Sequence, residues 1–125
     1  MTPKVKELYN QLKQAYESKN TSGVTRCLSS QWGSSDGGSV SDLQRNLQKI
    51  FTMFDEVRFN IQNLQINKVN EEKYKVNYDV TITSKIYKKN LKHEEKSSIN
   101  EEVTIDQSGQ PKISRTLGGK LLSVK

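Results

Sequence analysis

The spacing of apolar residues changes once along this sequence of 125 residues, at Asp55, from helical to alternating. Up to Asp55, apolar side chains recur three and four residues apart, as they do on one face of an amphipathic helix. Beyond Asp55 they alternate with polar side chains, which is typical of strands with one covered face. Amphipathic helices that precede a series of antiparallel strands pack on one face of the sheet. The sequence therefore predicts an α+β fold, in which N-terminal helices pack on a curved antiparallel β-meander.

The helical part of the chain also contains signals for helix ends. In chain order it predicts a helix, a short helix, a loop and a third helix, at residues 2–19, 21–28, 29–39 and 41–55. Asn20 and Thr21 break the first helix and cap the second. The loop holds Trp32 and three glycines. Ser41 begins the third helix, because Ser41 to Gln44 has the S-x-x-Q pattern of a capping box.

The alternating part of the chain predicts four strands, at residues 57–66, 74–86, 99–105 and 113–117. The apolar phase changes near Gln62 and Asn63, which indicates a bulge or a sharp bend in the first strand. The second strand is much longer than the usual length of about five or six residues. Polar turns and one charged hairpin join the strands, at residues 70–73, 106–109 and 88–96. Three apolar residues near the end of the sequence either prolong the last strand or form a tail: Leu121, Leu122 and Val124.

Length and composition indicate one folded domain across residues 1–125. The mass of 14.3 kDa is that of one ordinary domain, and 32% hydrophobic residues suffice for one core. No window approaches the ~20 consecutive apolar residues of a membrane-spanning helix, and the N-terminal segment lacks the features of a signal peptide. We therefore expect a soluble protein, either cytoplasmic or the mature part of an exported one.

Cysteine and histidine each occur once, as Cys27 and His93. A single cysteine cannot form an intrachain disulfide, and these two residues are too few for a zinc site of the usual Cys/His kind. Cys27 follows Val24 at helical spacing, which is typical of a small core residue rather than of a nucleophile. We expect no metal, no cofactor and no catalytic role for His93.

The net charge of +6 suggests polyanion binding, but lysines and acids are mixed along most of the chain. Five lysines gather within residues 85–96, where Glu94 and Glu95 dilute them. Only four arginines occur, although arginine suits bidentate phosphate or base recognition better than lysine does. The preferred interpretation is a solvated hairpin, with no specific nucleic acid and no membrane as partner. Weak polyanion binding is the alternative, through Lys85, Lys88, Lys89 and Lys92.

Glu101 is the most unusual residue of the alternating part. It shares the phase of Ile99 and Val103, so its carboxylate is aimed at the covered face of the sheet. Burial of an unpaired carboxylate there would be unfavourable. The carboxylate must therefore have a partner, have a raised pKa or lie at the solvent-filled entrance of a pocket. A bulge at Glu101 and Glu102 would instead turn the side chain outward, and this is the preferred interpretation. Glu101 remains a weak candidate for a catalytic residue.

Several aromatic residues are candidates for the lining of a pocket. Tyr74 and Tyr78 lie on the apolar stripe of the long strand. They either place their hydroxyls in a pocket or are core residues with hydroxyls at the rim of the core, and we prefer the second interpretation. Trp32 either lines a ligand site or fills the open end of the fold. The complete predicted lining comprises Tyr16, Trp32, Phe54, Tyr74, Tyr78 and Glu101.

Three stretches of the sequence resemble one family. The first is residues 12–28, which contain Ala15-Tyr16 and Lys19-Asn20. The second is residues 51–57, which lead into the change of apolar phase before Leu64-Gln65-Ile66. The third is the hairpin of residues 105–113. These stretches resemble the nuclear transport factor 2-like superfamily, also called the cystatin-like cone folds, and its bacterial members in particular. Pro111 stands where the family's closing hairpin often has an aromatic residue. The resemblance implies a single cone-shaped domain, or α-β roll, across residues 1–125.

The resemblance implies a range of functions, because the family includes ketosteroid isomerase-like and dehydratase-like enzymes, transport adaptors and domains without assigned activity. In the enzymes, the cone encloses an apolar pocket with a few ionisable groups that transfer protons. The position of the isomerases' first-helix tyrosine falls near Leu12 or Lys13 here, so it is not matched. Asp36 lies in the predicted loop, and nothing identifies it as the isomerase base.

The preferred function is therefore a domain without enzymatic activity that binds a small apolar ligand or a protein partner. The alternative is a proton-transfer isomerase or dehydratase that uses Glu101 with Tyr74 or Tyr78. In this family the exposed sheet face commonly mediates dimerisation. Here that face is predicted to carry polar residues, namely Asn77, Asp79, Thr81 and Thr83. Because the core of an obligate dimer interface is apolar, we expect a monomer or a weak homodimer through this face.

Overall fold

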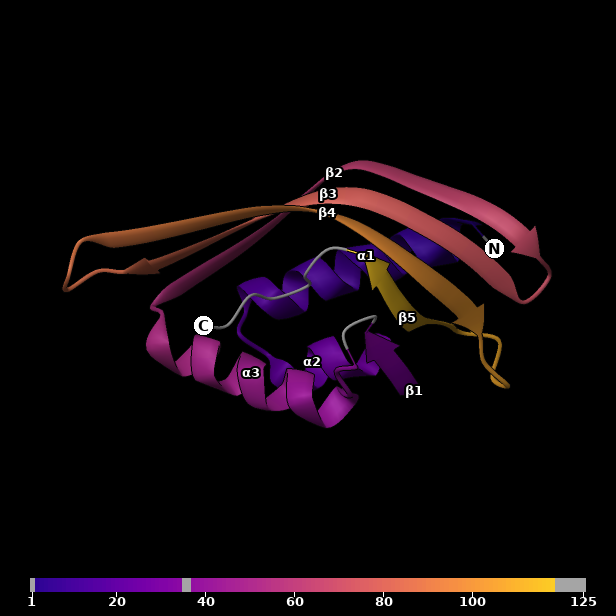
Figure 1. Ribbon diagram of the computed structural model, residues 1–125, viewed down its shortest axis with the longest axis horizontal. Coiled ribbons are helices and arrows are strands. Elements are labelled where there is room, and N and C mark those ends of the chain that lie inside the picture. The colour runs from indigo at the N-terminus through magenta and orange to yellow at the C-terminus, as the bar shows by residue number, and fades with distance from the viewer. Residues whose placement is uncertain (1, 35–36, 119–125) are drawn as a thin grey trace.

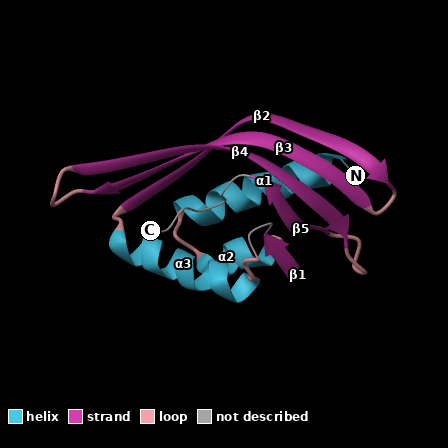
Figure 2. Ribbon diagram, viewed as in Figure 1, coloured by secondary structure: helices cyan, strands magenta, loops and turns pink. Residues whose placement is uncertain are grey.

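The computed structural model describes residues 2–34 and 37–118, in which helices lie on one side of a curved sheet (Figures 1 and 2). The elements are, in chain order, α1 (Thr2–Glu17), α2 (Thr21–Arg26), β1 (Leu28–Ser34), α3 (Val40–Met53), β2 (Glu56–Asn70), β3 (Lys73–Ile86), β4 (Leu91–Ile105) and β5 (Pro111–Gly118). The α+β class with N-terminal helices on a curved sheet is confirmed.

The sheet has five strands in the order β1-β5-β4-β3-β2. Strands β2 to β5 form the predicted antiparallel meander. The bulge predicted near Asn63 is confirmed, because the register of β2 against β3 shifts between Gln62 and Gln65 and Asn63 has a φ of 56°. The turn predicted at residues 106–109 is also confirmed, with Gly109 at a φ of 80° that a glycine adopts without strain.

The fifth strand corrects the predicted loop. Residues 29–34 form part of β1, which pairs in parallel with β5 through Leu28↔Ile113 and Ser34↔Thr116. Apart from Trp32, this segment has serine, glycine and glutamine rather than strand-forming residues, and its pairing with β5, more than 80 residues later, makes it a strand. Asp36, from the same predicted loop, lies outside the described residues, as do Leu121, Leu122 and Val124.

Helix and hairpin boundaries also differ in part from the prediction. Asn20 caps α2 as expected, but Ser39 and Asp42 form the capping box of α3, so the predicted start at Ser41 is wrong by two residues. The carboxylate of Asp42 accepts from the main-chain N–H of Ser39, which Gln44, two residues further along the helix, is too far away to do. The β3–β4 turn occupies only residues 87–90, so His93 is on β4 rather than at the tip of a longer hairpin.

The core lies between α1 and the concave face of the sheet (Figure 1). The buried positions of α1 are those that the helical spacing predicted: Val5, Leu8, Tyr9, Leu12, Ala15 and Tyr16. Opposite them, alternate residues of β3 are buried from Tyr74 to Ile82. Full burial of each large apolar side chain stabilises the fold by about 1.5–3 kcal/mol.

The edge strand β2 is partly closed by side chains of α1. The amine of Lys13 donates to the carbonyl of Phe59 at 2.9 Å, and Glu17 Oε2 accepts from the Phe59 N–H at 3.1 Å. Lys13 and Glu17 are themselves an ion pair at 2.8 Å. The pair thus supplies the donor and the acceptor that a neighbouring strand would supply, which hinders edge-to-edge pairing at this point.

Glu17→Ala is expected to lower the free energy of unfolding by about 1–2 kcal/mol, because the covered N–H of Phe59 loses its acceptor. Glu7→Ala on the same helix is the matched control, since Glu7 is exposed and makes one long hydrogen bond with Asn10, at 3.5 Å. Urea unfolding followed by circular dichroism measures both losses. Equal losses would show that Glu17 does not support the edge of β2.

Candidate functional site

A buried carboxylate lies at the centre of the cone. Glu101, on β4, is only 1% exposed, and it accepts hydrogen bonds from the hydroxyls of Tyr9 and Tyr78 at 2.8 Å each. The hydroxyl of Thr116 on β5 donates to the other carboxylate oxygen at 2.6 Å. Helix α1 and strands β3, β4 and β5 therefore each contribute one side chain to the cluster.

The preferred outward position of Glu101 is wrong. The register of β4 against β5 does shift around Glu101 and Glu102, but the register against β3 is continuous, with Val76 opposite Glu101 and Lys75 opposite Glu102. Continuous pairing with β3 preserves the alternation of the two faces, so Glu101 stays on the concave side. The bulge changes how β5 meets β4 and leaves the direction of this side chain unchanged.

The hydrogen bonds have a defined direction that fits an ionised carboxylate. The indole N–H of Trp32, which can only donate, is bonded to Thr116 Oγ1 at 3.1 Å. Thr116 therefore accepts from Trp32 and donates its own proton to Glu101. Among the described residues Glu101 has hydroxyl donors but makes no ion pair with a lysine or an arginine.

Burial dominates the acidity of the cluster. It raises the pKa of Glu101, and the hydrogen bonds from Thr116, Tyr78 and Tyr9 only partly oppose this rise. Burial, together with the nearby charge of Glu101, also raises the pKa values of Tyr9 and Tyr78 well above 10. Both tyrosines therefore keep their protons and remain donors.

Tyr16 provides a second polar group inside the cone, and this group lacks a partner. Its ring stacks on Phe59 with a centroid distance of 4.3 Å and meets Phe51 edge to face at 6.1 Å. The residue has no exposed surface, and its hydroxyl makes no hydrogen bond within the described part of the chain. Leaving a buried hydroxyl unpaired costs about 1–3 kcal/mol. The hydroxyl of Tyr16 therefore carries this cost within the described part of the chain.

The structure brings together part of the predicted lining. Tyr78 and Glu101 are in direct contact, and Trp32 reaches Glu101 through Thr116. Tyr74 is buried, and Phe54 is half-buried against the core.

Sequence reasoning missed the cluster's other two members, Tyr9 and Thr116. Tyr9 lies seven residues before Tyr16 on the buried face of α1, and this two-turn spacing of tyrosines is a signal that could have identified it. Thr116 carries no comparable signal, because the irregular pairing of β5 decides its direction.

The remaining candidates lie elsewhere. Lys85 is within 3.5 Å of Glu56, Lys92 is within 3.9 Å of Glu94, and Lys88 and Lys89 are exposed in the β3–β4 turn. Cys27 is a core residue as predicted, and burial raises the pKa of its thiol to about 11.

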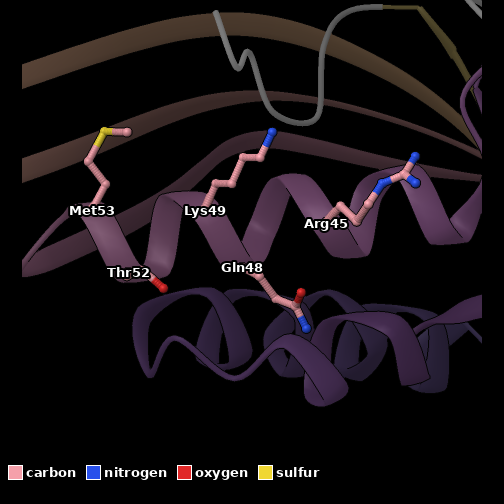
Figure 3. A pocket seen from close by; sticks show the side chains of 5 residues that line it. All are labelled: Arg45, Gln48, Lys49, Thr52 and Met53. Carbon is pink, nitrogen blue, oxygen red and sulfur yellow. The ribbon is translucent and has the colours of Figure 1, made fainter.

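Other kinds of site were searched for in the described residues. No three His, Cys, Asp or Glu side chains lie close enough together there to hold a metal ion. None of the described helices is long and apolar enough to cross a membrane. A groove of about 560 Å³ lies along α3 and contains none of the predicted lining residues (Figure 3). Its walls are Arg45, Gln48, Lys49, Thr52 and Met53.

The stability of the wild type relative to Glu101→Gln is expected to fall as the pH rises above 4.5, the ordinary carboxyl value. The folded protein keeps the Glu101 proton to a higher pH than the unfolded chain does, so ionisation in this window favours unfolding. The free energy of unfolding of the wild type minus that of Glu101→Gln is therefore largest below pH 4.5. It decreases as the pH passes through the raised pKa of Glu101 and is constant at higher pH.

Urea unfolding of both proteins at a series of pH values between 4 and 8 measures this difference. Hydrogen bonds from Asn63 and Ser98 lower the pKa of Asp79, and the one from Ser108 lowers that of Asp106. Such surface carboxyls titrate below pH 4.5 in both proteins and cancel in the comparison. A difference that stays constant between pH 4.5 and 8 would contradict the raised pKa of Glu101.

No protein-family model and no curated protein matches this sequence. The structure, however, resembles solved structures over nearly its whole length. A scytalone dehydratase-like protein from Novosphingobium aromaticivorans superposes with a TM-score of 0.83 at 14% identity, over 99% of this chain and 89% of that chain. The hexachlorocyclohexane dehydrochlorinase LinA-type3 from Novosphingobium barchaimii gives a TM-score of 0.75 at 13% identity, over 95% and 84%.

A third neighbour is a Nostoc punctiforme protein of unknown function with a cystatin-like fold. It gives a TM-score of 0.71 at 11% identity, over 93% of this chain and 87% of that chain. At such low identities the likeness concerns the fold and not the activity. The order of the elements, the curved sheet and these superpositions together identify the architecture: this protein shares the fold of these neighbours, a cystatin-like fold.

Proposed function

We propose that this protein is a binding domain without enzymatic activity, which holds a small and largely apolar molecule inside the cone beside Tyr16. The observation that carries the proposal is the hydroxyl of Tyr16, which is fully buried and lacks a hydrogen-bond partner among the described residues. Buried polar groups in folded proteins are nearly always paired, so an unpaired one marks a place where a ligand or a water completes the structure.

The surroundings of Tyr16 support an apolar ligand that carries one oxygen acceptor. The rings of Phe51 and Phe59 flank Tyr16, and such aromatic walls favour an apolar body. The phenol has a raised pKa, caused by burial and then by the charge of Glu101, so it remains a donor. A ketone or ether oxygen on the ligand would accept its hydrogen bond.

The position of Glu101 supports binding over catalysis. A general base must lie within hydrogen-bond reach of the proton that it removes. Glu101 already accepts three hydrogen bonds and is 1% exposed, so its oxygens are turned to the protein.

A second candidate is proton transfer by Glu101, favoured by its raised pKa beside two tyrosine hydroxyls. Two of the structural neighbours are named for the removal of water and of hydrogen chloride from small molecules. Under this candidate, the protein turns over enones or β-hydroxy ketones, and Glu101→Gln abolishes the turnover without unfolding the protein. A panel of such compounds with no turnover above background would exclude it.

The binding proposal predicts that a bicyclic ketone, tetralone, binds more tightly than its parent hydrocarbon, tetralin. Tyr16→Phe is expected to weaken tetralone binding roughly fivefold to tenfold, because a hydrogen bond is worth about 0.5–1.5 kcal/mol, and to leave tetralin binding unchanged. The unliganded variant should be as stable as the wild type or more stable, since it loses an unpaired hydroxyl. Titration calorimetry measures the affinities, and thermal unfolding measures the stability.

Tyr74→Phe is the matched control, because Tyr74 is an equally buried tyrosine that is 1% exposed and is not one of the described donors to Glu101. Wild-type protein that binds neither compound would reject the proposal. Equal weakening of tetralone binding by the two variants would reject the role of Tyr16.

A further inference from the structure

The concave face of β4 carries carboxylates, and the lysines of this strand are on the opposite face. Residues directly opposite each other on neighbouring strands lie on the same face of a sheet. Glu95 is opposite Ile82, and Glu101 is opposite Val76, and both of these partners are buried on the concave side. Lys92 and Lys96 have the other parity and lie on the convex face. The crowd of lysines in the sequence is therefore not a feature of the cone interior.

Glu95 is half-buried and makes no ion pair and no hydrogen bond in the described part of the chain. Its neighbour Glu94, on the convex face, is within 3.9 Å of both Lys92 and Lys96. The two adjacent carboxylates thus have opposite environments, and of the two only the one facing the cone lacks a cation among the residues that the structure describes.

Two cations on the helices are engaged elsewhere. Lys13 of α1 is held by Glu17 and by the carbonyl of Phe59. Arg45 of α3 is bound to Asp42 in the first turn of its own helix. Lys49 makes no ion pair among the described residues, and its side chain extends from α3 on the same side as those of Arg45 and Met53 (Figure 3).

Glu95 lies across the sheet from Tyr16 and its aromatic neighbours. Tyr16 stacks on Phe59, Phe59 is opposite Ile82, and Ile82 is opposite Glu95. Phe59 and Glu95 are two strand spacings apart, and two spacings amount to about 10 Å. A single small molecule can therefore meet the hydroxyl of Tyr16 and the carboxylate of Glu95 at its two ends.

We infer that the ligand carries a positive charge, as an amine that pairs with Glu95 while its oxygen acceptor meets Tyr16. This inference rests on the proposed binding function and adds the charge of the ligand to it. Glu101 contributes a second negative charge to the same concave face and disfavours anionic ligands. Partial burial of an unpaired carboxylate is unfavourable, and an amine supplies the missing partner.

Three probes of one shape test the charge. They are para-aminomethylacetophenone, para-hydroxymethylacetophenone and para-acetylbenzoate, which share a ketone and are respectively cationic, neutral and anionic at pH 7. Titration calorimetry with the wild type is expected to give roughly tenfold tighter binding for the amine than for the alcohol, and weaker binding still for the carboxylate. Glu95→Gln should remove the preference for the amine and leave the affinity for the alcohol unchanged.

Glu94→Gln is the matched control, because it makes the same change of charge one residue away on the convex face, and it should keep the preference. Thermal unfolding confirms that both variants are folded. Equal binding of amine and alcohol by the wild type, or equal loss of the preference in both variants, would overturn the inference and leave the binding function standing. Tightest binding of the carboxylate would also overturn it. Failure of all three probes to bind would reject the binding function and this inference together.

Discussion

The burial of one carboxylate constrains most of this fold. Glu101 accepts hydrogen bonds from Tyr9, Tyr78 and Thr116, and Thr116 accepts one from Trp32. A carboxylate away from water is costly unless several donors are held in place around it. The three strands β3, β4 and β5, helix α1 and the parallel strand β1 must therefore be correctly placed at the same time, and the loss of any one donor would leave the charge less compensated.

This arrangement places a cluster of polar side chains in the interior of the cone. The carboxylate is surrounded by donors that are already used, whereas the hydroxyl of Tyr16, beside two aromatic rings, has no partner among residues 2–34 and 37–118. The hydrogen bonds of Glu101 compensate for its burial, whereas under the proposed function a ligand completes the hydrogen bonding of Tyr16. Glu95, half-buried on the same face, extends this polarity along β4.

The candidate site could be predicted only in part. Alternation along β4 indicated that Glu101 shares the face of Ile99 and Val103, which is correct, and the postulated outward turn at the bulge was the mistake. Tyr78 was predicted because it lies on the apolar stripe of the same sheet. Tyr9 and Thr116 were missed, since they approach Glu101 from positions 92 and 15 residues away along the chain. Hydrophobic periodicity contains no information about contacts between residues that are distant in the sequence.

The amino-acid sequence by itself determined the number and kind of most elements, because the spacing of apolar residues depends on the local geometry of helix and strand. It also determined the bulge near Asn63 and the cap at Asn20, which depend on neighbouring residues. Only the tertiary structure decided that residues 28–34 are a strand, that Glu101 has three donors and that the lysines and carboxylates of β4 are on opposite faces of the cone. These features arise where distant segments pair, and the free energy that selects them comes from those contacts and not from local preference.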